Sequence, residues 1–198
     1  YTVADGLPDA QVRALHLDRA GALWVATETG LAVVSSDGVL TAQRLREGRW
    51  PAGVMAIATA PTGELWLCTQ DHGVVRWADG RLLPVTLTSE ARPTDSMLAD
   101  RQGRLWVVLQ GGGIGVVERD GAFRVLRRGD RFHRSELAIY EDRSGAIWFG
   151  AGGRLTRFKD GVLTAITPAN GLPADTIRAI VGDDDDHLWI GTSGGILR

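Results

Sequence analysis

Gly21-Ala-Leu-Trp24 is the first of five closely similar phrases in this chain of 198 residues, each ending in tryptophan. The other four are Gly63-Glu-Leu-Trp66, Gly103-Arg-Leu-Trp106, Gly145-Ala-Ile-Trp148 and Asp186-His-Leu-Trp189. The intervals between successive tryptophans are 42, 40, 42 and 41 residues. A period near 41 residues indicates a repeat architecture, so one repeat, once understood, describes the whole chain.

The first repeat predicts four short strands. Alternating or β-branched runs occupy residues 12–17, 23–27 and 31–34, and a fourth run occupies residues 39–45. A tight turn is expected at Asp18-Arg-Ala-Gly21, because aspartate accepts hydrogen bonds from the backbone ahead of it and glycine adopts left-handed dihedrals.

Both turn signals recur along the chain. The Asp-Gly hairpin signal occurs at Asp37-Gly38, Asp79-Gly80, Asp120-Gly121 and Asp160-Gly161. The turn aspartate returns as Asp100, Asp142 and Asp183, whereas the second repeat has Ala60. Four antiparallel strands in a 41-residue repeat are typical of a β-propeller blade. We therefore predict an all-β propeller of four-stranded blades, with the five tryptophans filling the space between neighbouring blades.

The repeats divide the chain into five blade equivalents within a single domain. The expected blades cover residues 6–46, 47–88, 89–129, 130–168 and 169–198, with residues 1–5 as the remnant of an outer strand. Two arrangements remain open: a closed five-bladed ring, and an arc of a larger propeller, usually seven-bladed. The arc, cut from a longer protein, is favoured because a few N-terminal residues would clasp the last blade weakly and leave strand edges exposed.

The amino-acid composition argues against several classes of function. The chain has 22 basic and 24 acidic residues, so no nucleic-acid-binding surface is expected. Its single cysteine, Cys68, excludes an internal disulfide framework. No run of 18 apolar residues occurs, so we expect no membrane contact by this segment. Neither the run Asp183–Asp186 nor the four histidines have the spacing of metal ligands, so no metal and no cofactor are expected.

The fifth repeat contains Asn170-Gly-Leu-Pro-Ala-Asp-Thr-Ile-Arg-Ala-Ile-Val-Gly-Asp183, then Leu188-Trp-Ile-Gly-Thr-Ser-Gly-Gly-Ile196. This phrase resembles the two-component regulator propeller repeat, which runs as Gly-Leu-Pro, a strand, Asp-x-x-Gly, Leu-Trp-Ile-Gly-Thr and Gly-Leu. In the first repeat the resemblance is carried by Asp5-Gly-Leu-Pro8 and Leu23-Trp-Val-Ala-Thr27. Repeats two to four lack Gly-Leu-Pro and match less well.

The resemblance implies a non-catalytic sensory module of a bacterial signalling receptor. Propeller repeats of this family usually form the periplasmic or extracytoplasmic part of a membrane-anchored regulator, which continues into a kinase or cyclase output domain. No catalytic residue belongs to the repeat motif, so the resemblance implies that this segment is not an enzyme. The implied partner is a small-molecule ligand, for example a carbohydrate, or another protein.

Candidate binding residues lie in two sets of loops that are expected to share one face of the propeller. One set joins each outer strand to the next blade, and the other joins the second and third strands of a blade. Trp50 offers a stacking surface for a sugar or aromatic ring, and the alternative is an anchor for its loop. The remaining candidates are Arg49, Asp71, His72, Arg131, His133, Arg134 and, on the inner strands, Arg13 and Arg178.

Two other functions remain open from the sequence. A propeller enzyme, either a lyase or a hydrolase, would assemble an acid–base or metal cluster from separate loops at the channel mouth. A structural repeat module would associate with a second copy through open blade edges. Converging histidines and carboxylates would indicate the enzyme, and unpaired edge strands would indicate the structural module.

Overall fold

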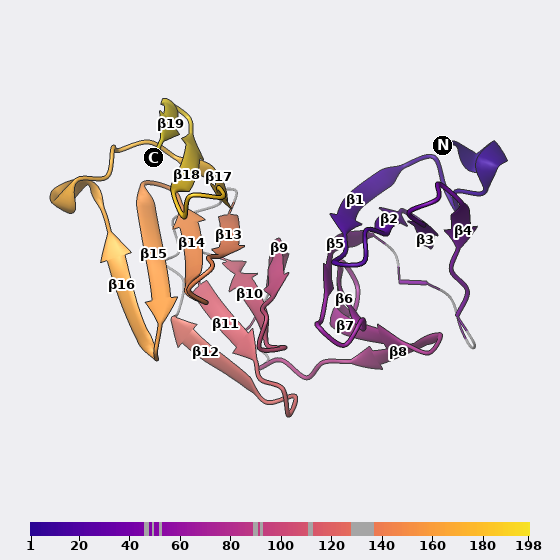
Figure 1. Ribbon diagram of the computed structural model, residues 1–198. Helices are drawn as coiled ribbons and strands as arrows, with labels where there is room; N and C mark the ends of the chain where they lie inside the picture. The colour runs from indigo at the N-terminus through magenta and orange to yellow at the C-terminus, as the bar shows by residue number, and fades with distance from the viewer. Residues whose placement is uncertain are drawn as a thin grey trace.

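The fold is an all-β propeller. The computed structural model describes residues 1–45, 48, 50–51, 53–88, 91, 93–110, 113–127 and 137–198. Its strands form five antiparallel sheets, four of them with four strands and the last with three. Within each sheet the strands pair in chain order, so each sheet is one blade (Figure 1). The fold class predicted from the tryptophan period is confirmed.

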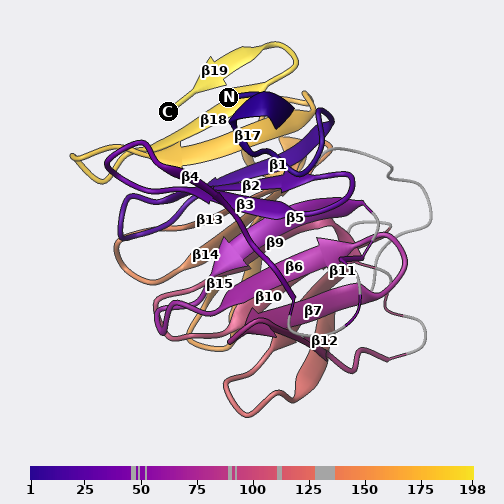
Figure 2. The same ribbon diagram turned by 90° about the vertical axis from the view of Figure 1, so that its right-hand side faces the viewer.

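Strand positions repeat from blade to blade, and Figure 2 shows the first blade lying above the second. The strands are β1 Val12–Leu17, β2 Leu23–Thr27, β3 Leu31–Val34 and β4 Leu40–Ala42; β5 Val54–Thr59, β6 Leu65–Thr69, β7 Gly73–Ala78 and β8 Arg81–Pro84; β9 Pro93–Ala99, β10 Leu105–Leu109, β11 Gly113–Val117 and β12 Phe123–Arg127; β13 Leu137–Glu141, β14 Ile147–Ala151, β15 Arg154–Lys159 and β16 Val162–Ile166; and β17 Ile177–Gly182, β18 Leu188–Thr192 and β19 Gly195–Leu197.

The N-terminal residues differ from the prediction of an outer-strand remnant. Residues Val3–Asp5 form a short 3-10 helix, η1, instead of an extended strand. The Thr2 hydroxyl accepts a hydrogen bond from the Ala4 amide, the Asp5 carboxylate accepts one from the Thr2 amide, and Gly6 ends the turn with a φ of 111°. These capping bonds favour the helical turn over extended backbone. The Tyr1 hydroxyl also donates to the Gly38 carbonyl, which fastens this segment to the first blade.

The repeated tryptophans pack between successive blades, as predicted. The Trp106 ring is fully buried, and its centroid lies 5.8 Å from Phe149 and 4.8 Å from Phe158 of the next blade. Trp66 packs in the same way against Leu105 and Val107 of the third blade. The first four repeated tryptophans, Trp24, Trp66, Trp106 and Trp148, therefore belong to cores shared with the blade that follows each of them.

Arginines in the turns before the tryptophans add a polar contact between later blades. The Arg101 guanidinium donates to the Asp142 and Arg143 carbonyls at 2.9 and 3.1 Å. One blade further on, Arg143 repeats the contact with the backbone and carboxylate of Asp184. These charge-assisted bonds join the turns of blades three, four and five on one face.

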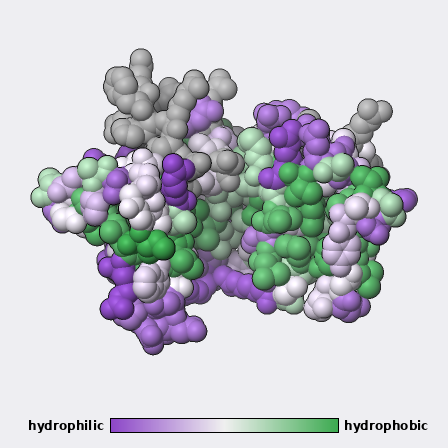
Figure 3. Space-filling model, turned by 90° about the horizontal axis from the view of Figure 1, so that it is seen from above, coloured by the Kyte–Doolittle hydropathy of each residue, from purple (hydrophilic) through white to green (hydrophobic). Residues whose placement is uncertain are grey.

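The first and last blades each have one uncovered side. Leu15 of β1 is 63% exposed, whereas its counterparts Ile57 and Ile180 in the same strand register are 7% and 9% exposed. Trp189 is 37% exposed, although the equivalent Trp106 is fully buried. Seen from above, the surface is hollowed between the two ends, with hydrophobic side chains on both sides of the hollow (Figure 3). The five blades therefore form an open arc.

Replacing the central tryptophan should cost far more stability than replacing the last one. We expect Trp106→Ala to lower the free energy of unfolding by about 3–5 kcal/mol, because it removes a fully buried ring and leaves a cavity. Trp189→Ala should cost clearly less, since that ring already contacts solvent. Urea unfolding of both variants measures the difference, and equal losses would contradict the packing order described above.

The uncovered apolar sides should make the chain associate with a second copy. Light scattering coupled to gel filtration should give a mass that rises above 21.3 kDa as concentration increases. Leu15→Glu should reduce this association by placing a charge on the exposed side of β1. Val162→Glu is the matched control, because Val162 is 61% exposed on the outer strand β16. A constant monomer mass, or an equal effect of both substitutions, would contradict the prediction.

Candidate functional site

The two predicted loop sets do share one face, called the loop face below. Backbone hydrogen bonds connect the two loop sets. In each case the loop between the second and third strands of a blade is bonded to the residues just before, or at the start of, an inner strand, which belongs either to the same blade or to the next one. These bonds run from Glu28 to Gln11 at 3.0 Å, Gln70 to Gly53 at 3.2 Å, Ile177 to Gly152 at 2.8 Å and Ser193 to Thr176 at 2.9 Å. Side chains from both loop sets can therefore line a common site.

Trp50 lies on the loop face and is half-buried. Its indole Nε1 donates to the Gln43 carbonyl at 3.1 Å, and its ring centroid lies 6.2 Å from that of Trp77. One part of the ring thus anchors the loop between the first two blades. Trp50 therefore anchors its loop, which was the alternative to ligand binding considered from the sequence. Another part of the same ring lines a neighbouring hollow.

The hollow beside Trp50 has a volume of about 570 Å³. Its lining comes from both loop sets: Glu28, Thr29, Gln43, Arg44, Leu45, Gly48 and Trp50. Glu28 also forms an ion pair with Arg13, with the Nε and Oε2 atoms 2.6 Å apart. Of the predicted residues, Trp50 therefore lines the hollow, whereas Arg13 contacts only Glu28 at its edge; Glu28 and Arg44 are additional lining residues.

Of the other residues predicted to bind a ligand, those that the structure describes do not line this hollow. Asp71 and His72 lie exposed in the turn between β6 and β7, outside the hollow, with Oδ1 and Nδ1 2.7 Å apart. Arg178 is exposed on β17 in the last blade. Arg49, Arg131, His133 and Arg134 lie outside the described residues.

The opposite face carries the turns that precede the tryptophan strands, called tryptophan turns below: residues 18–22, 60–64, 100–104, 142–146 and 183–187. In four of them the aspartate accepts a hydrogen bond from the indole six residues later. The distances are 2.9 Å for Asp18–Trp24 and 2.7 Å each for Asp100–Trp106, Asp142–Trp148 and Asp183–Trp189. This bond is not among the features predicted from the sequence, although the constant spacing of six residues between aspartate and tryptophan indicates it.

These hydrogen bonds also set the acidity of the aspartates. The Trp189 indole, with the amides of His187 and Asp185, lowers the pKa of Asp183 to about 2. Burial alone would raise the pKa of Asp18, but bonds from Trp24 and the backbone outweigh it and hold the pKa below its usual value. The same balance lowers the pKa of Asp142. Each hydrogen bond stabilises the ionised carboxylate, so these aspartates are charged at neutral pH.

The run of four aspartates has structural partners. Asp183 holds the Trp189 indole, while Asp184 and Asp186 approach Arg143 at 2.8 and 3.5 Å. Among the described residues, no group of three or more His, Cys, Asp or Glu side chains is placed to hold a metal ion.

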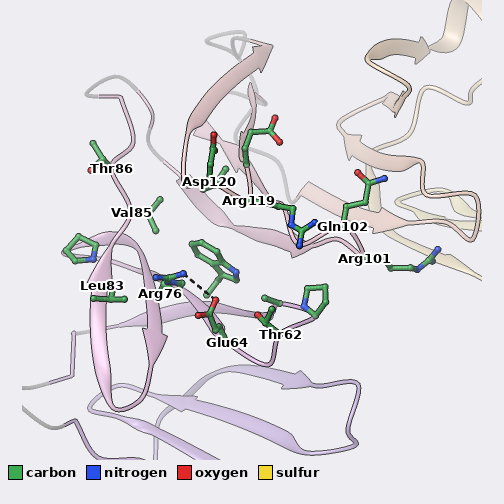
Figure 4. A pocket seen from close by; sticks show the side chains of 18 residues that line it. Thr62, Glu64, Arg76, Leu83, Val85, Thr86, Arg101, Gln102, Arg119 and Asp120 are labelled. Atoms are coloured by element: carbon green, nitrogen blue, oxygen red, sulfur yellow. Dashed lines mark hydrogen bonds and ion pairs between the residues drawn. The ribbon is translucent and has the colours of Figure 1, made fainter.

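A second pocket, of about 520 Å³, opens on the face of the tryptophan turns, between the second and third blades (Figure 4). Glu64 and Arg76 form an ion pair of 3.4 Å on the side of the second blade. Arg101 and Gln102 lie on the opposite side, and Arg119 and Asp120 lie above, in the view of Figure 4. None of these residues was a sequence candidate, because their repeats match the family pattern weakly and nothing in one repeat shows which blades meet.

Two of the five repeats match a known protein family. A sequence profile described as "Two component regulator propeller" matches residues 6–29 and 171–194. Both segments therefore match the two-component regulator propeller repeat. The two matched segments include the first and fifth tryptophan turns, and the resemblance expected from the Gly-Leu-Pro and Leu-Trp phrases is confirmed there.

Solved structures of proteins with different functions share the fold. The extracellular domain of a protein described as a hybrid two component system from B. thetaiotaomicron has 20% identity and a TM-score of 0.73, over 94% of this chain and 27% of that one. Virginiamycin B lyase from Staphylococcus aureus has 20% identity and a TM-score of 0.71, over 94% of this chain and 69% of that one. YCF48 bound to D1 peptide has 18% identity and a TM-score of 0.70, over 96% and 63%.

At these identities the structural similarity shows the fold alone. The chain spans about a quarter of the receptor domain and about two thirds of the lyase. No curated protein sequence matches the chain significantly. The described residues contain no helix with the length and apolar character needed to cross a membrane.

The Asp–Trp hydrogen bonds should make stability depend on pH in the acid range. The pKa of Asp183 is about 2 in the folded protein against an ordinary value of 3.8, so the unfolded chain takes up the proton first as pH falls. The stabilisation is therefore complete above about pH 4 and is lost as pH falls toward about 2. Urea unfolding at several pH values should show this loss.

The loss between about pH 4 and about pH 2 should be smaller in Asp183→Asn, which has no carboxylate to protonate. Asp185→Asn serves as the control, because Asp185 is exposed in the same tryptophan turn and the Trp189 indole donates to Asp183. An equal pH dependence in the two variants would contradict the role assigned to Asp183.

Proposed function

We propose that this segment is a non-catalytic, ligand-sensing part of a bacterial signalling receptor of the two-component type. Two observations support the receptor assignment: the matched repeats, and the shared fold with an extracellular domain described as part of a hybrid two component system. In this proposal the segment lies outside the cytoplasm, and the parent protein carries the membrane anchor and output domain.

The ligand site of this proposal is the hollow beside Trp50. The observation that carries it is the convergence of an aromatic ring, a guanidinium from Arg44 and a carboxylate from Glu28 across two loop sets. An indole face packs against the apolar face of a sugar ring, and the charged groups around it hydrogen-bond hydroxyls. A carbohydrate is therefore the ligand class that this surface fits best.

Binding should depend on the Trp50 ring. Titration of the chain with a panel of neutral and acidic oligosaccharides, followed by calorimetry, should identify a ligand. Trp50→Leu keeps an apolar side chain in the loop but removes the aromatic face, so affinity should fall about three- to tenfold. Arg44→Gln should also weaken binding, because Arg44 is exposed at the hollow and can donate to hydroxyls.

Arg154→Gln provides the matched control. Arg154 is exposed at the start of β15, next to a loop of the same face but in the fourth blade, and it does not line the hollow. It should bind as the unsubstituted chain does. The absence of any bound oligosaccharide, or equal affinities for all three variants, would refute the assignment of this hollow.

A further inference from the structure

Four of the five tryptophan turns use one aspartate to satisfy several donors. In the third blade, Asp100 Oδ2 accepts from the Trp106 indole at 2.7 Å. Its Oδ1 accepts from the amides of Gln102 and Arg104, both at 2.9 Å. One carboxylate thus receives four N–H groups: two from the backbone of the turn, one from the tryptophan of the following strand and one from the Arg104 guanidinium, whose Nε lies 2.7 Å from Oδ2.

The second blade keeps the donors and lacks the carboxylate. Its turn has the same backbone hydrogen bonds, Gly63 to the Ala60 carbonyl at 2.9 Å and Ala60 to the Glu64 carbonyl at 2.8 Å. The methyl group of Ala60 cannot accept a hydrogen bond, so the Thr62 and Glu64 amides lose the side-chain acceptor present in the other blades. Trp66 is only 8% exposed, and its Nε1 is buried without a hydrogen-bond partner.

An unpartnered buried donor is unfavourable, and such groups are rare in folded proteins. Only one other buried side-chain donor of this kind, Trp77 Nε1, occurs among the described residues. The position at Ala60 is therefore a defect in the repeat, and an acceptor supplied from outside would correct it.

The defect opens into the pocket between the second and third blades. Ala60, Thr62, Glu64 and Trp66 all line this pocket, whose volume of about 520 Å³ exceeds that of a carboxylate group by far. A ligand with a carboxylate at one end and several further atoms therefore fits the space. The carboxylate end would lie at Ala60, and the rest of the molecule would extend toward the third blade.

Three acidic and three basic side chains are among the described residues that line the pocket, so the partners of each decide which charge a ligand meets. Asp120 accepts a hydrogen bond from the Ala122 amide at 2.9 Å. Glu64 is paired with Arg76, and Glu118 is paired with Arg124 of the same blade. Arg119 is exposed on the pocket wall and makes no hydrogen bond or ion pair with any residue that the structure describes. A free guanidinium thus faces the pocket, where it can bind a second anionic group of the ligand.

We propose that this pocket binds a small organic acid whose carboxylate takes the place of the missing aspartate side chain. One carboxylate oxygen accepts from Trp66 Nε1, and the other accepts from the amides of Thr62 and Glu64, as Asp100 does in the third blade. Arg119 contacts the distal end, so dicarboxylates bind more tightly than monocarboxylates. This site is separate from the hollow beside Trp50 and does not depend on the function proposed for that hollow.

The direct test follows the seven tryptophan indole N–H resonances by NMR, with Trp66→Phe used to assign the Trp66 signal. Titration with succinate should shift the Trp66 resonance selectively, and acetate should do so at higher concentration. Acetamide, the neutral analogue of acetate, should leave it unchanged. No shift with succinate, or an equal shift with acetamide, would overturn the proposal.

A substitution that restores the repeat gives the second test. Ala60→Asp should provide the internal carboxylate, raise the Tm by about 2–4 °C and abolish the succinate-dependent shift, because the acceptor position is already filled. Retention of the shift in this variant would place the anion elsewhere and overturn the proposal. If this variant does not fold, the titration of the unsubstituted chain still decides the question.

Two further measurements separate the ligand classes. Arg119→Gln should weaken succinate binding about three- to tenfold and leave acetate binding unchanged, because only the longer acid reaches Arg119. A peptide containing aspartate should not bind more tightly than succinate. If the peptide binds and succinate does not, the acceptor is the side chain of a partner protein and the small-acid assignment is wrong.

Discussion

The hydrogen bond between a turn aspartate and the tryptophan six residues later is the interaction on which this architecture depends. It fixes the tight turn through the backbone amides and orients the indole ring in the same step. The ring then packs against the following blade, so a local turn determines a contact between blades. Because the carboxylate accepts the indole N–H, the tryptophan is buried without an unsatisfied polar group. Where Ala60 interrupts the pattern, packing persists but a donor is left without an acceptor.

Packing between blades runs in one direction along the chain, and this explains the uneven exposure of equivalent residues. A tryptophan is covered by the next blade and an inner-strand residue by the previous one. Leu15 has no preceding blade, and Trp189 has no following one, so both are exposed despite sequence contexts that resemble their buried counterparts. Whether one of these equivalent residues is buried therefore depends on whether a neighbouring blade covers it.

The two faces of the arc differ in chemistry. On the loop face, side chains from different loop sets meet, and the partly exposed Trp50 lies beside charged groups from both sets. On the opposite face, regular hydrogen bonds occupy most polar groups, and the one irregular turn lies beside a pocket. Loops can vary without disturbing the strands, whereas the tryptophan turns are held to a common pattern by their packing role. A departure from that pattern is therefore more informative than variation in a loop.

The sequence by itself determined the blade, because the tryptophan period, the alternating strands and the turn residues all act over short distances. The expected strands at 12–17, 23–27 and 31–34 agree with β1, β2 and β3 residue for residue. It did not determine which blades are covered, which side chains meet at Trp50, or that Ala60 opens into a pocket. The N-terminal turn also escaped prediction, since capping by Thr2 and Asp5 outweighs the similarity to an outer strand. The N-terminal turn is a local feature, whereas the coverage of the blades, the hollow at Trp50 and the pocket at Ala60 depend on contacts between repeats, and the information within one repeat cannot specify its neighbours.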